Sequence, residues 1–197
     1  MTRTALKQQP RTGLVRLADF IHAVDAIVTR APDEAAILDA GEVLLKELIA
    51  IDDWLPNSHA RPHPDHYQQY LLYADPRGRF SVVSFVWGPG QATPVHDHTV
   101  WGLVGVLRGS ESVETYRRDD RGRLLPLGEG KLLRGEVDAV SPRIGDIHRV
   151  ANGEAGVSVS IHVYGADIGQ VKRSTYAADG TPKTFISGYA TAPAIDL

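Results

Sequence analysis

Apolar residues in the first quarter of the chain follow the period of an α-helix. They recur at three- and four-residue intervals over residues 14–28, which predicts an amphipathic helix. A second helix is predicted to begin near Pro32 and Asp33 and to run through Leu48 or Ile49, because proline suits a first turn and acidic residues suit the positive end of the helix dipole. Residues 1–12 are polar, without a periodic pattern, and are expected to fray.

After Tyr73 the pattern changes to short apolar runs that Gly, Pro or Asp separates. Such closely spaced runs favour an antiparallel β-sandwich or barrel. The segment 119–122 is typical of a hairpin turn between two of the strands. A short helix or strand is expected at Tyr67, and strands are expected over residues 80–86, 101–106, 112–116 and 157–164.

The composition is that of one soluble globular domain. The 197 residues are 43% hydrophobic and 23% charged, and the net charge of -3 comes without a run of Lys or Arg. We therefore expect a small-molecule partner and neither nucleic acid nor a membrane; the oligomeric state stays open. No apolar run reaches the roughly 20 residues that span a bilayer, so a cytoplasmic protein is expected. Residues 1–66 are interpreted as a helical extension and connection, and residues 67–197 as the β-barrel.

The chain has no cysteine, so any metal must be held by His, Asp or Glu. His96 and His98 lie two residues apart, which on a strand places both imidazoles on one face. His148 follows a turn that contains Gly145, and closure of a sandwich could bring it to the pair. Paired histidines are also common as polar surface or satisfied core groups. Three imidazoles also suit zinc, so geometry alone does not select iron.

The wider glycine and histidine pattern resembles the two cupin motifs. The first contains Gly90, His96, His98 and Gly109, and the second contains Gly145, His148 and Asn152. In cupins the glycines make turns at the ends of a double-stranded β-helix, and the histidines point into its mouth. The resemblance implies a mainly β jelly-roll barrel with the N-terminal α-helices packed on it. Gly102 stands where cupins usually have a glutamate ligand.

Three stretches together resemble thiol dioxygenases of the cysteine dioxygenase family. They are residues 96–102, 145–148 and 158–165. The likeness extends over roughly residues 60 to 175. In that family three histidines bind ferrous iron, and both atoms of O2 end on the substrate sulfur as a sulfinate. The resemblance implies that His96, His98 and His148 hold Fe(2+).

Ser160, His162 and Tyr164 lie two residues apart, so a strand presents all three on one face. Alone, this spacing is also that of any amphipathic strand. The resemblance implies a Ser-His-Tyr series beside the iron, in which serine orients imidazole and imidazole orients the phenol. Mammalian members cross-link this tyrosine to a cysteine at the position of Gly102. Without a cysteine, Tyr164 is expected to be unmodified, as in bacterial members.

Gln69 stands where cysteine dioxygenases carry an arginine for the substrate carboxylate. An amide donates hydrogen bonds but forms no ion pair, so substrate preference should shift. This glutamine type resembles 3-mercaptopropionate dioxygenases, in which a later arginine supports the glutamine, and Arg173 stands at that position; alone, Arg173 could be a solvated charge beside Lys172.

The first hypothesis is a thiol dioxygenase that oxidises a small mercapto carboxylic acid, with 3-mercaptopropionate ahead of L-cysteine. In it, Tyr164 and Gln69 position the carboxylate and the oxygen. A metal-binding cupin without oxygen chemistry, such as a sensor or an isomerase, is the second hypothesis. A zinc hydrolase comes last, because Asp97 points to the opposite face of a strand from the two histidines beside it.

Overall fold

A computed structural model describes residues 13–30 and 33–197 of the chain. Within these ranges the chain forms two α-helices, one short 3-10 helix (η1, Asn57–His59) and eleven β-strands. The expectation that residues 1–12 fray, and the placement of Pro32 in a helix, lie outside the described residues. The mainly β class is confirmed.

Both predicted helices are present. α1 spans Gly13–Arg30 and α2 spans Glu34–Ile49. Asp33 lies just before α2 and caps it, because its carboxylate accepts a hydrogen bond from the backbone N–H of Ala36 at 2.9 Å. The buried side chains of α1 keep the spacing that predicted this helix; they are Leu17, Phe20, Ile21 and Val24.

The strands form two antiparallel sheets. The five-stranded sheet has the order β1-β2-β9-β4-β7 and contains β1 (Gln68–Ala74), β2 (Ser81–Trp87), β4 (Gly102–Arg108), β7 (Val137–Val140) and β9 (Ser158–Tyr164). The six-stranded sheet has the order β11-β10-β3-β8-β5-β6 and contains β3 (Val95–His96), β5 (Ser110–Arg118), β6 (Leu124–Leu133), β8 (Ile147–Asn152), β10 (Arg173–Tyr176) and β11 (Pro182–Phe185). This is the two-sheet barrel that the sequence predicted.

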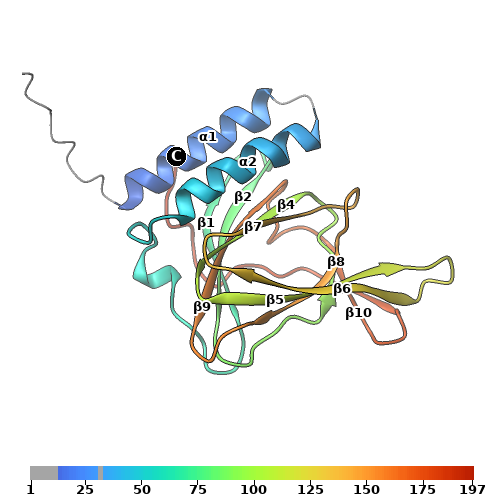
Figure 1. Ribbon diagram of the computed structural model, residues 1–197. Coiled ribbons are helices and arrows are strands. Elements are labelled where there is room, and N and C mark those ends of the chain that lie inside the picture. Colours follow the sequence, from blue (N-terminus) through green and yellow to red (C-terminus); the bar gives the residue numbers. More distant parts are fainter. Residues whose placement is uncertain (1–12, 31–32) are drawn as a thin grey trace, which may run out of the picture.

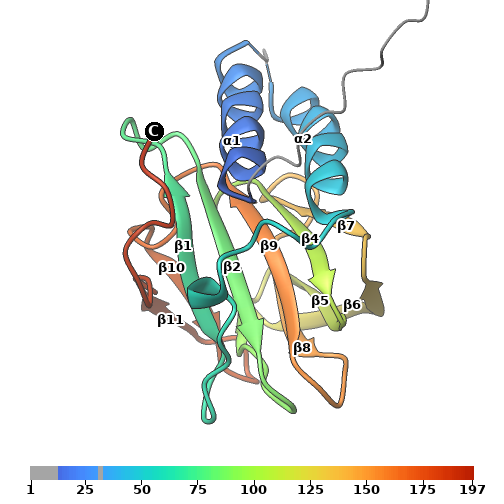
Figure 2. The ribbon, with the colours of Figure 1, turned by 90° about the vertical axis from the view of Figure 1, so that its left-hand side faces the viewer.

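The central strand β9 is buried on both faces, which gives the molecule three layers. Val159, Ile161 and Val163 belong to the hydrophobic cluster that includes the inward side chains of α1 and α2. The alternate positions of β9 face the second sheet instead, and Tyr164 packs in a separate cluster there. The two helices cover the outer face of the five-stranded sheet (Figures 1 and 2). The interior between the sheets is thus left for polar side chains of β9.

The four strands expected from apolar runs are confirmed within a few residues, and the segment that follows Tyr67 is the strand β1. Residues 119–122 form the expected turn: the N–H of Gly122 donates to the carbonyl of Asp119 at 2.9 Å, and Gly122 has φ 79°. β6 was not predicted, because Pro126, Gly128 and Gly130 interrupt its leucines and most of its residues are exposed. With β5 it forms a hairpin that extends away from the body (Figure 1).

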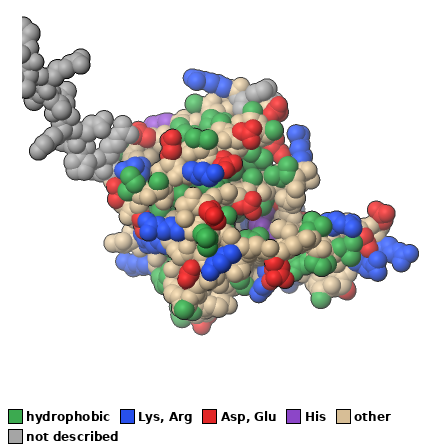
Figure 3. Space-filling view, viewed as in Figure 1, with side chains coloured by type: hydrophobic (Ala, Val, Ile, Leu, Met, Phe, Trp, Pro, Cys, Tyr) green, Lys and Arg blue, Asp and Glu red, His purple; other side chains and the backbone are tan. Residues whose placement is uncertain are grey.

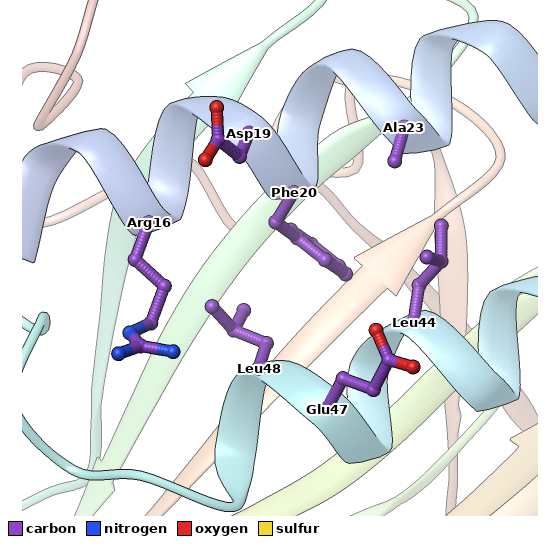
Figure 4. A pocket seen from close by; sticks show the side chains of 7 residues that line it. All are labelled: Arg16, Asp19, Phe20, Ala23, Leu44, Glu47 and Leu48. Carbon is purple, nitrogen blue, oxygen red and sulfur yellow. The ribbon is translucent and has the colours of Figure 1, made fainter. Parts of the chain in front are cut away.

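The surface shows charges of both signs. Lys and Arg are interspersed with Asp and Glu over the face seen in Figure 3. Within the described parts of the chain, no helix combines the length and apolar character that crossing a membrane requires. A cavity of about 230 Å³ lies between α1 and α2, where Phe20 points toward α2 (Figure 4). It contains no histidine, and Arg16 at its rim pairs with Asp53 at 3.1 Å.

Candidate metal centre

Three histidines from two strands and one loop converge inside the barrel. His96 on β3 and His148 on β8 are direct cross-strand partners, and His98 follows β3 by two residues. One ring nitrogen of each lies within 4.8 Å of the others. The three residues are only 7%, 5% and 1% exposed, in the order named. The structure thus brings together the three ligands expected from the sequence.

The backbone conformation that brings His98 into this cluster differs from the predicted strand. β3 ends at His96, so strand alternation does not place His98 beside it. Instead, the carboxylate of Asp146 accepts hydrogen bonds from the backbone N–H groups of His98 at 3.0 Å and Thr99 at 2.8 Å. Thr99 has φ 62°, a conformation that β-branched residues rarely adopt. The carboxylate stabilises this strained turn and so positions His98.

Hydrogen bonds to Nδ1 of His96 and of His98 determine which ring nitrogen of each faces the centre of the cluster. Nδ1 of His98 lies 3.0 Å from Oδ1 of Asp146, and Nδ1 of His96 lies 3.1 Å from the carbonyl oxygen of Pro94. Both partners are acceptors, so each Nδ1 carries the proton and Nε2 keeps its lone pair. Nε2 of His96 and Nε2 of His98 are therefore available to bind a metal ion.

Burial keeps the three imidazoles neutral. It lowers the pKa of His96 to about 4, and it lowers the pKa values of His98 and His148 well below their usual range. Burial also raises the pKa of Asp146, while the N–H groups of Thr99 and His98 act in the opposite direction. Neutral imidazoles bind a divalent cation without first losing a proton. The donor set therefore fits a divalent transition metal held by three nitrogens.

A hydrogen-bonded series of side chains runs along β9 to this cluster. Oγ of Ser160 lies 2.8 Å from Nε2 of His162, and Nδ1 of His162 lies 2.8 Å from the hydroxyl oxygen of Tyr164. The Tyr164 ring stacks on His98 with 5.3 Å between ring centroids. Burial lowers the pKa of His162 to about 3 and raises that of Tyr164 well above its usual range. At neutral pH the series contains a neutral imidazole and a protonated phenol.

Gly102 occupies the position expected for a fourth, carboxylate ligand. It is the cross-strand partner of Tyr164, and a β-carbon added to it would lie 2.8 Å from Cδ1 of that ring. The tyrosine ring therefore fills the space into which a longer side chain would extend. This contact explains in steric terms why the cluster has three protein ligands.

A cavity of about 270 Å³ opens beside His96. On its wall, Nε2 of Gln69 donates to Oγ of Ser187 at 3.1 Å, and Nη2 of Arg173 contacts the same oxygen at 2.6 Å. Arg173 is only 4% exposed and packs over the ring of Phe185. The alternative that Arg173 is a solvated surface charge is therefore wrong.

Three residues of this region were missed by the sequence analysis. Asp146 adjoins the second histidine motif, and a carboxylate two residues before a ligand is a signal that could have found it. Ser187 carries no such signal, because it lies 118 residues from Gln69 and reaches it only through the fold. Glu111 lies on a strand whose other acidic residue, Glu114, is more exposed, so its burial was not apparent.

The fold and the histidine cluster define a metal-binding protein of the cupin class. The family model for cysteine dioxygenase type I matches residues 38–176, and the chain belongs to this family. It is accordingly a metal-dependent cupin dioxygenase.

Several solved structures are also similar to part of the chain. A Thermus thermophilus protein is 20% identical with a TM-score of 0.43, covering 59% of this chain and 96% of that one. A Klebsiella pneumoniae protein with a double-stranded β-helix domain is 18% identical with a TM-score of 0.40, covering 56% and 85%. A cupin superfamily protein of Desulfitobacterium hafniense is 17% identical with a TM-score of 0.40, covering 57% and 95%. None of these likenesses bears on the substrate of this chain.

Proposed function

We propose that this protein is an iron(II)-dependent thiol dioxygenase that oxidises a small mercapto carboxylic acid to its sulfinate, with 3-mercaptopropionate as the preferred substrate. The observation that carries the substrate class is the buried guanidinium of Arg173, which shares one cavity with His96. Among the described residues Arg173 forms no salt bridge, its Nε has no hydrogen-bond partner, and Asp97 acts on its charge only without direct contact. A buried cation without an anion attracts one from the substrate.

The charges around the cavity support a substrate without an ammonium group. Arg173 and Lys183 both line the cavity, and among the described residues neither Asp nor Glu does. A carboxylate is attracted to this wall. The ammonium group of cysteine would meet two cations and no acidic partner, which costs binding free energy. Selectivity for 3-mercaptopropionate over L-cysteine follows from this difference.

Each group of the site then has a task. His96, His98 and His148 would hold the iron, which supplies the centre at which thiol sulfur and O2 react. Arg173 and Gln69 bind the carboxylate, and Ser187 fixes both donors relative to each other. Tyr67 and Phe85 form an aromatic wall with ring centroids 6.0 Å apart, which excludes water.

The reaction balances without a further reductant. The O–O bond breaks and two S–O bonds form, so one thiol and one O2 give one sulfinic acid, and sulfur supplies the four electrons that O2 accepts. The thiol proton must leave the sulfur. The hydroxyl of Tyr164, bonded to Nδ1 of His162, offers a hydrogen bond beside the metal ligands, and the thiol proton is released with the sulfinate product.

The test compares three thiols on protein loaded anaerobically with iron(II) and then exposed to air. They are 3-mercaptopropionate, L-cysteine and cysteamine, which has the ammonium group but no carboxylate. Oxygen uptake and sulfinate are both measured, and His148→Ala protein treated in the same way corrects for oxidation by free iron. We expect the highest kcat/KM with 3-mercaptopropionate and the lowest with cysteamine.

The other outcomes identify the part that fails. A higher kcat/KM with L-cysteine leaves the dioxygenase in place and overturns the substrate preference. Iron binding without oxidation of any thiol favours a metal-binding cupin that has no oxygen chemistry.

A further inference from the structure

Glu111 is a buried carboxylate that the proposed reaction does not use. It lies on β5, its side chain is 0% exposed, and among the described residues neither of its carboxylate oxygens has a partner at standard hydrogen-bond geometry. On the same strand, Glu114 is partly exposed and pairs with Arg149 at 2.5 Å. Burying a carboxylate without a cation is costly, so the position of Glu111 needs an explanation.

Two side chains at the inner end of the Ser-His-Tyr series, those of Ser160 and Trp87, influence the pKa of Glu111. Burial raises the pKa of Glu111 to about 7, and the hydroxyl of Ser160 and the indole N–H of Trp87 act in the opposite direction. Trp87 also donates a long hydrogen bond of 3.4 Å to Oγ of Ser160. The negative charge of Glu111 in turn raises the pKa of Tyr164, so the two ends of the series are coupled.

In the described part of the chain, the residues paired with Glu111 on the neighbouring strands carry no charge. The cross-strand partners of Glu111 are the neutral Asn152 on β8 and Leu132 on β6. Lys131 on β6 and Glu154 after β8 are 3.9 Å from each other and half-exposed, and Glu154 accepts a hydrogen bond from Ser110. From β9, the titratable groups are His162 and Tyr164 of the series itself.

We propose that Glu111 is the inner end of the Ser160-His162-Tyr164 series, and that its protonation sets whether the Tyr164 hydroxyl donates or accepts a hydrogen bond at the metal centre. Glu111 is a positioning residue in this scheme, because it acts through Ser160. The consequence for catalysis rests on the proposed function, whereas the coupling within the series does not.

When Glu111 is ionised, the hydrogen bonds run inward. Ser160 donates its proton to the carboxylate, and its oxygen accepts from Nε2–H of His162 and from Trp87. Nδ1 of His162 is then an acceptor, so the phenol of Tyr164 donates to it. The Tyr164 oxygen presents only lone pairs to the metal centre. Ser160 uses its one donor and both acceptor positions.

When Glu111 is protonated, every bond in the series reverses. Glu111 donates to Oγ of Ser160, Ser160 donates to Nε2 of His162, and Nδ1–H donates to the Tyr164 oxygen. The phenol proton is then free to point into the site. Ser160 is again fully satisfied, because it still accepts from Trp87. The protonated state contains one proton more than the ionised state. The Tyr164 oxygen takes up this proton from the site, and one proton moves along each hydrogen bond of the series. The last of these proton shifts protonates Glu111.

The test observes the tautomer of His162 directly. The full-length chain is loaded with zinc, which keeps the metal centre diamagnetic, and the ¹⁵N shifts of the imidazole are followed from about pH 5 to about pH 9. His162→Gln identifies the signals. We expect Nδ1–H at low pH and Nε2–H at high pH, with a midpoint at the pH where ¹³C-labelled Glu111 titrates. Glu111→Gln should abolish the switch, whereas Glu129→Gln, the same change at an exposed position of β6, should leave it intact.

The outcomes separate this inference from the proposed function. A His162 tautomer that does not change in the parent protein overturns the inference, and so does an unchanged switch in Glu111→Gln. Should that variant fail to fold, the parent titration alone decides. A switch in a protein that oxidises no thiol supports the inference and contradicts the proposed function. Thiol oxidation by a protein in which the His162 tautomer does not change supports the proposed function and overturns the inference.

Discussion

Gly102 lies directly across from Tyr164 on neighbouring strands, so closely that a β-carbon at Gly102 would lie 2.8 Å from Cδ1 of the tyrosine ring. The same ring stacks on His98 and its hydroxyl is bonded to His162. The absence of one side chain on β4 therefore determines where the phenol stands relative to the metal ligands.

Gly102→Ala should displace the Tyr164 ring and lower kcat/KM by about tenfold or more, because sub-ångström misplacement of a reacting group is costly. Iron content should stay at the parental level, since no ligand is touched. Gly105→Ala is the matched control: it lies on the same strand, but its β-carbon would meet buried side chains of Leu45 and Ile49 on α2 instead of the Tyr164 ring. Equal loss of activity in both variants would contradict the account.

Tyr164→Phe and His148→Ala should separate chemistry from metal binding. The first removes only the hydroxyl that bonds to His162, so turnover, or the yield of sulfinate per O2 consumed, should fall while iron content stays unchanged. The second removes a ligand and should lose the iron itself. Metal analysis and oxygen uptake on the same samples check both. Parental activity in Tyr164→Phe would show that its assigned role is wrong.

Asp146→Asn should weaken metal binding about 10- to 100-fold, in the range found for partners of ligating histidines. The amide keeps one acceptor oxygen but loses the charge that holds Nδ1 of His98 and the strained turn at Thr99. Competition with a chelator measures the change. Asp138→Asn, at an exposed carboxylate of β7, serves as the control and should bind metal as the parent does.

Arg173→Gln should raise KM for 3-mercaptopropionate by about tenfold or more, because loss of a buried charge-assisted contact costs on the order of 1.5 to 3 kcal/mol. The kcat/KM for cysteamine should not fall, because cysteamine has no carboxylate to lose and its ammonium group meets one cation fewer. Lys172→Gln removes the neighbouring exposed charge and is the control. An equal effect on both thiols would argue against a carboxylate site at Arg173.

Glu111 should make the protein less stable as the pH rises. Its pKa is raised to about 7 in the folded state, so between pH 4.5 and 7 the folded protein holds a proton that the unfolded chain has released. Stability from this group is greatest below that window and falls across it, by at most about 3 kcal/mol. Denaturant midpoints of the parent and Glu111→Gln from about pH 5 to 8 should show the slope reduced in the variant. Parallel curves would contradict the raised pKa.

The sequence was informative where one period or one motif decides the structure. The spacing of Leu17, Phe20 and Val24 predicted α1, and the apolar run at 157–164 predicted β9, because burial of one face or both leaves a regular pattern. The family resemblance supplied His96, His98 and His148 as metal ligands. Those predictions depend on local patterns that the fold does not override.

Other features arise only from contacts between distant segments. β6 belongs to an exposed hairpin, and Pro126, Gly128 and Gly130 break up its leucines, so no regular apolar pattern marks it as a strand. His98 reaches the cluster through Asp146, which lies 48 residues away, and not through strand alternation. The positions of Ser187 and Glu111 likewise follow from contacts between distant segments. No local pattern contains that information.

The most direct test of the central claim is to supply 3-mercaptopropionate and oxygen-18 gas to the iron-loaded protein. Mass spectrometry then measures how many labelled oxygen atoms the product contains. We expect a sulfinate in which both oxygen atoms carry the label, at a yield of one sulfinate per O2 consumed. A sulfinate with one labelled atom or none, or consumption of O2 without sulfinate, would contradict a thiol dioxygenase.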